Sequence, residues 1–225
     1  YVGLVLLLIV VVWHSTQRGS WIPIGDNFDA LIWLAILLAG FVQYIQRARS
    51  LAGLDWFVMP IVLLLLIGAA VLGTQDYLTY GHNAWLLVHR ITSYVGAIAF
   101  AIAAATGAMY LLAARKLRRK QIPSGPPMGS LERLEHLTMV AVTLGFALLT
   151  VGVVTGVVYW LAEQQRPHTG KVFLSGLAWL VYAVMLHSPI NPRLRGRRMA
   201  MLSISGFVLM LATLVAVAIM SGAKA

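Results

Sequence analysis

The stretch Trp85–Leu112, WLLVHRITSYVGAIAFAIAAATGAMYLL, decides the fold class of this chain. Arg90 is its only residue of the Lys, Arg, Asp and Glu types. About 20 predominantly apolar residues in a helix cross the roughly 30 Å hydrocarbon core of a bilayer. Because this stretch is longer and apolar almost throughout, it predicts a transmembrane helix.

Similar apolar runs recur along the whole chain of 225 residues. They lie at about residues 1–13, 28–46, 56–73, 137–161, 172–186 and 199–221. Hydrophobic residues make up 60% of the chain and charged residues 11%, whereas about a quarter of a soluble protein is charged. The sequence therefore predicts a single integral membrane domain over residues 1–225: an all-α, polytopic transmembrane helix bundle of about seven spans.

The distribution of Lys and Arg predicts the orientation of this bundle. Alternate loops hold twelve of the 17 basic residues, and the opposite side holds five. Because basic loops stay in the cytoplasm, the basic segment 115–135 is predicted to be cytoplasmic, most simply at a bacterial inner membrane. Within this segment, Ser130 is the expected N-cap of the next span. The net charge of +10 lies in short loops rather than on one exposed face, so we expect the lipid bilayer and no nucleic acid as a partner.

Two further features limit the chemistry. The chain has no cysteine, which excludes disulfides, thiolate metal sites and covalent attachment of haem to this chain. Its seven acidic residues are scattered at span ends and in loops, and no catalytic acid/base pair is visible. We therefore expect no independent catalytic activity.

His89 is the strongest candidate for a ligand-binding residue, because it lies one turn inside its span. Ionisable groups at membrane depth usually face the bundle interior and are functional candidates. The helical face that follows His89 is composed mostly of small residues: Ser93, Gly96, Phe100, Ala103 and Gly107. A haem ligated by an axial histidine needs such a groove. Tight helix packing is the alternative explanation for small residues.

The other histidines form two groups by depth. His187 follows a face of Ala183, Leu180 and Gly176 near the inner side, where His136 begins the fifth span. An inner pair His136/His187 and an outer pair His89/His14 would permit bis-histidine ligation of haem b, with His89 and His187 as the leading iron ligands. Arg90 and Trp85 are outer candidates for binding the propionates. His82 and His168 have the surroundings of solvated loop residues.

Three stretches of the chain resemble the cytochrome c assembly (CcsA/HemX-like) family of polytopic haem-handling proteins. They are WLLVHRITSYVGAIAFAIAAATGAMY at residues 85–110, LERLEHLTMVAVTLGFALLTVGVVTGVVYW at residues 131–160, and residues 177–207, which include AWLVYAVMLH and RLRGRRMAMLSISGF. The resemblance implies haem binding, with His89 in the place of an outer ligand and His187 in that of a transmembrane ligand. It also implies cytochrome c maturation components as partners.

The chain departs from this family pattern in two places. The segment 162–171, AEQQRPHTGK, contains no tryptophan where the family has a tryptophan-rich outer segment, and the tail SGAKA lacks a second outer histidine. Two alternatives therefore remain beside a haem-handling protein. One is an electron-transfer or anchoring subunit of a membrane redox complex that keeps b-type haem, and the other is a haem-free scaffold that packs against other membrane subunits.

Overall fold

A computed structural model describes residues 2–18, 27–49, 53–72, 84–120, 130–163, 169–187, 191 and 194–222. In these residues the chain forms seven α-helices and no strand, which confirms the predicted all-α class. The helices are α1 (Val2–Arg18), α2 (Asn27–Arg49), α3 (Asp55–Leu72), α4 (Ala84–Arg118), α5 (Leu131–Glu163), α6 (Thr169–Leu186) and α7 (Arg197–Gly222).

The lengths and composition of these helices are those of a membrane protein. Within the described residues, three segments are long and apolar enough to cross a bilayer: Phe28–Arg47, Ala84–Arg118 and Leu131–Ala162. Shorter apolar helices occupy Gly3–Gln17, Asp55–Val71 and Val172–Leu186. Because all lipid-exposed backbone must satisfy its hydrogen bonds internally, a chain of this kind can cross a bilayer only as helices.

The helices α4 and α5 extend beyond their predicted spans. They contain 35 and 33 residues, which corresponds to about 50 Å each at 1.5 Å per residue. Both ends of the basic segment predicted as a loop, residues 115–135, are therefore helical, since α4 ends at Arg118 and α5 begins at Leu131. Ser130 caps α5 as predicted, with its Oγ 3.2 Å from the backbone N–H of Arg133, which donates to it.

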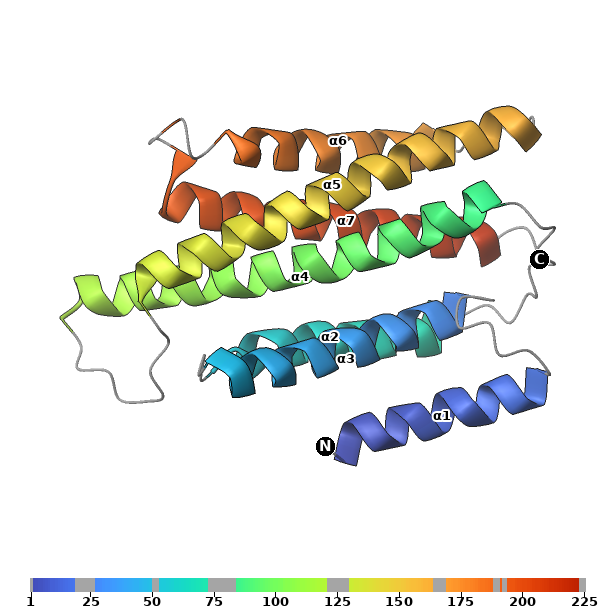
Figure 1. The fold of residues 1–225 in the computed structure, drawn as a ribbon, viewed down its shortest axis with the longest axis horizontal. Helices are drawn as coiled ribbons and strands as arrows, with labels where there is room; N and C mark the ends of the chain where they lie inside the picture. The colour runs from blue at the N-terminus through green and yellow to red at the C-terminus, as the bar shows by residue number, and fades with distance from the viewer. Residues whose placement is uncertain are drawn as a thin grey trace.

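Figure 1 shows that α4, α5, α6 and α7 lie side by side, with α2 and α3 next to them and α1 at the edge beyond. The most extensive contact is between α4 and α5, which cross at a shallow angle along most of their length. The helix α7 packs on both α4 and α6, while α1 packs on α2. This arrangement brings the last four helices, α4 to α7, around one shared interface.

Glycines on α5 and α7 allow large aromatic rings into that interface. The rings of Phe100 and Tyr182 are both fully buried and stack with centroids 3.6 Å apart and an interplanar angle of 8°. A Cβ added at Gly145 would lie 2.6 Å from the Phe100 ring, and one at Gly206 would lie 2.7 Å from the Tyr182 ring. From Phe100 to Gly107, the small-residue face of α4 therefore packs against other helices. Tight helix packing was the alternative explanation to a haem-binding groove for this part of the face.

Candidate functional site

His89 is held in a fixed orientation near the N-terminal end of α4, the end predicted to be outer. Its Nδ1 lies 2.6 Å from the backbone carbonyl oxygen of Gly152 on α5. A carbonyl oxygen can only accept, so Nδ1 carries the hydrogen and donates it. In the neutral imidazole the lone pair is then on Nε2, the nitrogen that a metal ion would bind. A ring whose other nitrogen donates to a backbone carbonyl is the usual arrangement for a metal-ligating histidine.

Two glycines of α5 make the space for this ring. Gly152 supplies the carbonyl, and Gly156 lies one turn further along the helix. A Cβ added at Gly156 would lie 2.9 Å from Nδ1 and 3.0 Å from Cε1 of His89. Any side chain larger than hydrogen at Gly156 would therefore require the imidazole to move. In the sequence, the signal for this space is the pair Gly152 and Gly156, four residues apart in the stretch 131–160.

A cavity of about 230 Å³ opens beside His89, between α4, α5, α6 and α7. Its walls are mostly small or apolar, and include Ser93, Ala97, Leu149, Val153, Ser175 and Ala178. Arg90 also lines the cavity, as its predicted role in binding an anionic group requires. Trp85 is 49% exposed and is not among the lining residues.

The lining residues suit a haem in chemical type. His89 and Arg90 supply an imidazole and a cation, and two further side chains of haem-ligating types, Tyr94 and Met210, reach the same cavity. Sequence reasoning missed both, because tyrosines and methionines in apolar spans give no distinct signal. The volume is below the 300–1,000 Å³ typical of sites that enclose a small ligand. The cavity can thus accept only part of a macrocycle.

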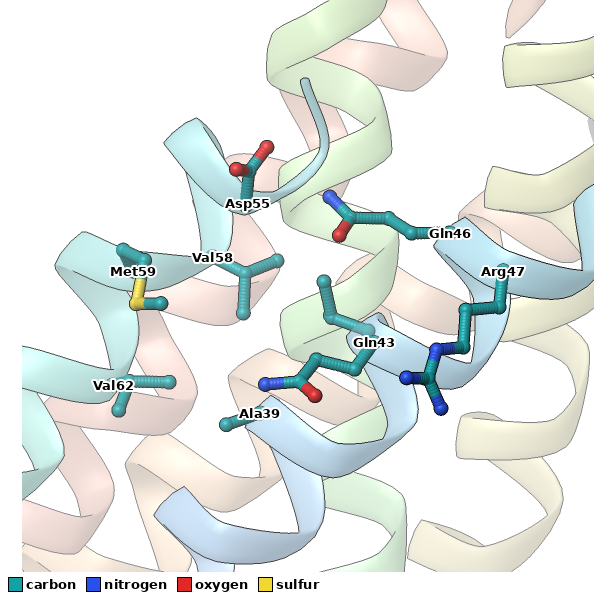
Figure 2. A pocket seen from close by; sticks show the side chains of 9 residues that line it. Ala39, Gln43, Gln46, Arg47, Asp55, Val58, Met59 and Val62 are labelled. Carbon is teal, nitrogen blue, oxygen red and sulfur yellow. The ribbon is translucent and has the colours of Figure 1, made fainter. Parts of the chain in front are cut away.

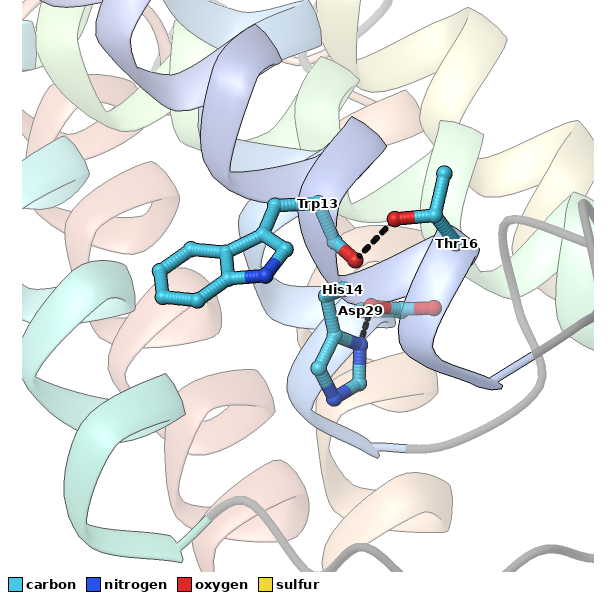
Figure 3. A network of polar contacts seen from close by, with 4 residues as sticks. All are labelled: Trp13, His14, Thr16 and Asp29. Atoms are coloured by element: carbon cyan, nitrogen blue, oxygen red, sulfur yellow. Dashed lines mark hydrogen bonds and ion pairs between the residues drawn. The ribbon is translucent and has the colours of Figure 1, made fainter.

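His14 forms a separate polar contact near the C-terminal end of α1. Its Nδ1 lies 2.8 Å from Oδ1 of Asp29 on the first turn of α2, as Figure 3 shows. The Asp29 side chain is completely buried. From the sequence we paired His14 with His89 and did not single out Asp29, although a carboxylate inside an apolar helix was an available signal. His14 does not line the cavity beside His89, so the predicted outer pair His89/His14 is not brought together there.

Comparison with known proteins identifies the family. The family model described as "Cytochrome C assembly protein" matches residues 3–223. The chain belongs to the cytochrome c assembly protein family. Its membership confirms the resemblance found in the sequence and the expected function class, a membrane protein of the cytochrome c assembly type.

Several named relatives of this family member cover most of its length. The "Cytochrome c biogenesis protein CcsA" of Synechococcus sp. (strain RCC307) is 25% identical, over 89% of this chain and 74% of the relative. The "Inner membrane protein YpjD" of Escherichia coli (strain K12) is 28% identical, over 92% of this chain and 82% of the relative. The CcsA protein of Prochlorococcus marinus (strain MIT 9312) is 24% identical, over 84% and 70%. No solved structure matches the chain.

The histidines of this family member that were predicted to be inner, His136 and His187, lie apart from the cavity beside His89. His187 is exposed at the end of α6, where its Nδ1 donates to the backbone carbonyl of Ala183, 2.9 Å away. Leu180 and Gly176, on the same face, are exposed as well, so this face of α6 is directed away from the helices it packs on. Periodicity alone cannot tell a covered face from a face left open.

His136 lines a second cavity, of about 740 Å³, at the predicted inner end of the bundle, where the C-terminal end of α4 meets the N-terminal ends of α5 and α7. This cavity is strongly charged, with Glu132, Glu135, Arg195 and Arg197 among its lining residues. His187 does not line it, so the described residues give no site that the predicted inner pair shares. Nor do they contain any group of three or more His, Cys, Asp or Glu side chains placed to hold a metal ion. His82 and His168 lie outside the described residues.

Proposed function

We propose that this protein binds haem b beside His89 and handles it for cytochrome c assembly in a bacterial inner membrane, with its basic loops in the cytoplasm. Family membership supports the process, since the CcsA relatives are named for cytochrome c biogenesis. The YpjD relative is named an inner membrane protein, which supports the proposed location in an inner membrane. Components of cytochrome c maturation are the proposed partners within that membrane.

The observation that carries the proposal is the hydrogen bond from His89 Nδ1 to the Gly152 carbonyl. It sets the tautomer and the ring orientation, so Nε2 is the nitrogen that would ligate the iron. Arg90, on the same wall, would neutralise a propionate with its guanidinium. A bound haem would supply a Lewis-acidic and redox-active iron. The protein's own contribution is to orient the imidazole, balance the charge and surround the ring with small apolar side chains.

The cavity beside His89 is preferred over the larger inner cavity because of charge. The inner cavity beside His136 is lined by the carboxylates of Glu132 and Glu135 as well as by two arginines, and Arg195 Nε lies 3.9 Å from Glu135 Oε1, so its cations already have carboxylates close by. Within the described part of the chain, His136 also has no hydrogen bond comparable to that of His89. Volume favours the inner cavity, but the hydrogen-bonded His89 and a cation with no carboxylate among the described lining residues favour the cavity beside His89.

The visible spectrum of the purified protein tests this proposal. We expect a reducible Soret band that falls at least about tenfold in His89→Ala, since even partners of a ligand contribute about 10- to 100-fold to metal affinity. His89→Gly should regain the band on addition of imidazole, which separates lost ligation from misfolding. His136→Ala, at an exposed histidine, is the matched control and should retain the band. Loss of the band in His136→Ala, with retention in His89→Ala, would move the site to the inner cavity.

The electron-transfer alternative has its own supporting observation. Only a short segment separates Glu163, the end of α5, from Thr169, the start of α6, and it has no tryptophan. Incubation of the haem-loaded protein with an excess of a haem-free acceptor protein separates the two functions. Transfer of haem to the acceptor supports handling, whereas reversible reduction and oxidation without transfer supports a resident electron carrier. A purified protein without a Soret band would favour the remaining alternative, a haem-free scaffold.

A further inference from the structure

A cleft of about 360 Å³ lies between the last turns of α2 and the first turns of α3, far along the chain from the residues that line the cavity beside His89. We propose that this cleft binds the headgroup of an aminophospholipid, with phosphatidylethanolamine as the type compound. The inference does not depend on haem binding, and its test has a lipid readout. It rests on which charges line the cleft and how they are arranged along the two helices.

The polar part of the cleft matches a zwitterionic headgroup. Arg47 and the amides of Gln43 and Gln46 come from α2, and Asp55 comes from the first turn of α3. Figure 2 shows the Gln43 and Gln46 side chains extending from α2 toward α3. A guanidinium and amide N–H groups donate to a phosphate, whereas a carboxylate accepts from an ammonium. The cleft thus presents both signs of charge that a phosphoethanolamine group needs.

The apolar part of the cleft continues from this polar end toward the middle of the helices. It consists of Ala39 and Val42 on α2 and Val58, Met59 and Val62 on α3. Val58 and Val62 are buried between the helices, while Met59 is 54% exposed. A lipid whose headgroup contacts the polar residues would lay its acyl chains against the accessible part of this lining, which is Met59 and the half-buried Ala39. The order of polar and apolar lining along the helices is that of a bilayer leaflet.

The opposite charges of Arg47 and Asp55 favour one type of phospholipid headgroup over others. A phosphatidylglycerol phosphate would be attracted to Arg47, but its glycerol offers no cation for Asp55. A phosphatidylcholine carries a cation that has no N–H to donate to that carboxylate. The volume of the cleft lies within the 300–1,000 Å³ range typical of small-ligand sites. Phosphatidylethanolamine is therefore the lipid whose groups all find partners.

Native mass spectrometry of the full chain, released from detergent with one lipid at a time, tests the proposal. We expect retention of phosphatidylethanolamine to exceed that of phosphatidylglycerol and of phosphatidylcholine about two- to fivefold, as one partly exposed charge contact of 0.5–1 kcal/mol implies. Soluble phosphoethanolamine should bind more weakly than the lipid, because it has no acyl chains. Equal retention of the three lipids, or equal binding of soluble phosphoethanolamine, would refute the proposal.

Substitutions assign the selectivity to the cleft. Asp55→Asn keeps the size of the side chain but removes its charge, and should abolish the preference over phosphatidylglycerol. The matched control is Glu132→Gln, which removes a carboxylate that lines the cavity beside His136 instead. Its preference should equal that of the unmodified chain. An unchanged preference in Asp55→Asn would overturn the assignment, and the comparison of lipids on the unmodified chain stands even if a variant does not fold.

Discussion

His89 combines three features that a ligand-binding histidine in a membrane needs. Its Nδ1 has a fixed acceptor in the Gly152 carbonyl, its ring lies against the glycine face of α5, and a cavity with a cation adjoins it. His14 has a different partner, the buried carboxylate of Asp29, at 2.8 Å. His136 and His187 are exposed. Among the described histidines, the immediate surroundings therefore distinguish His89 as the proposed haem ligand.

Gly156→Ala tests the space that holds the His89 ring, without removing the ring. The added methyl group would lie 2.9 Å from Nδ1, so the imidazole must shift from the Gly152 carbonyl. We expect a fall in haem affinity of about 10- to 100-fold, the range for loss of a partner that orients a ligand, measured by haem titration. The overall stability should change little, because alanine is the better helix former.

Gly40→Ala is the matched control for this experiment. Gly40 lies within α2, and a Cβ there would meet nothing within 4 Å. This variant should bind haem as the unmodified chain does. Equal haem affinities for Gly156→Ala and Gly40→Ala would show that the position of the His89 ring does not control binding.

At the scale of the helices, α4 is the element that organises the bundle. It has its most extensive contact with α5, and it also packs on α7. A hydrogen bond of 2.8 Å joins the hydroxyls of Thr106 and Thr138 across the buried α4–α5 interface. Gly107 faces α7, where an added Cβ would contact the Ser203 hydroxyl and lie 3.1 Å from the Ala200 carbonyl oxygen. Small residues in membranes allow this close approach of helix backbones.

Gly107→Val should separate α4 from α7. The Cβ alone would lie 3.1 Å from the Ala200 carbonyl oxygen and 3.3 Å from its Cα, and these backbone atoms cannot rotate away from the larger valine side chain. Overpacking of this kind costs about 1–3 kcal/mol, and we expect that loss in the free energy of unfolding in mild detergent. Gly40→Val introduces the same side chain at an open position and should cost well under 1 kcal/mol. A matching loss in the two variants would mean that the α4–α7 contact does not limit stability.

At the scale of the whole molecule, the basic loops predict which ends of the bundle face the cytoplasm. The absence of cysteine makes single-cysteine labelling unambiguous. Gln17→Cys, at the exposed end of α1, should react with a membrane-impermeant maleimide in intact spheroplasts. Glu132→Cys, exposed at the start of α5, should react only after permeabilisation, because its end of the bundle holds the basic loops. The reverse labelling pattern would invert the proposed topology and place the cavity beside His89 at the cytoplasmic side.

The sequence by itself determined the helical membrane class, the approximate spans, the N-cap at Ser130 and the family. These features follow from local composition, because a bilayer leaves helices as the means for a chain of this kind to cross it, and a cap acts within four residues. The sequence also singled out His89 and Arg90 from their depth in one span. All of this information is carried by residues close together in the chain.

Only the tertiary structure decided which residues meet. His89 finds its carbonyl partner 63 residues away, and His14 finds its carboxylate 15 residues away on another helix. The face of His187 resembled a ligand groove by spacing, but no neighbouring helix covers it in the described part of the chain. Helical periodicity states which side chains share a face, whereas the packing of large against small residues decides which face another helix covers. For this reason, the histidine pairs predicted from the sequence differ from the site that the tertiary structure forms around His89.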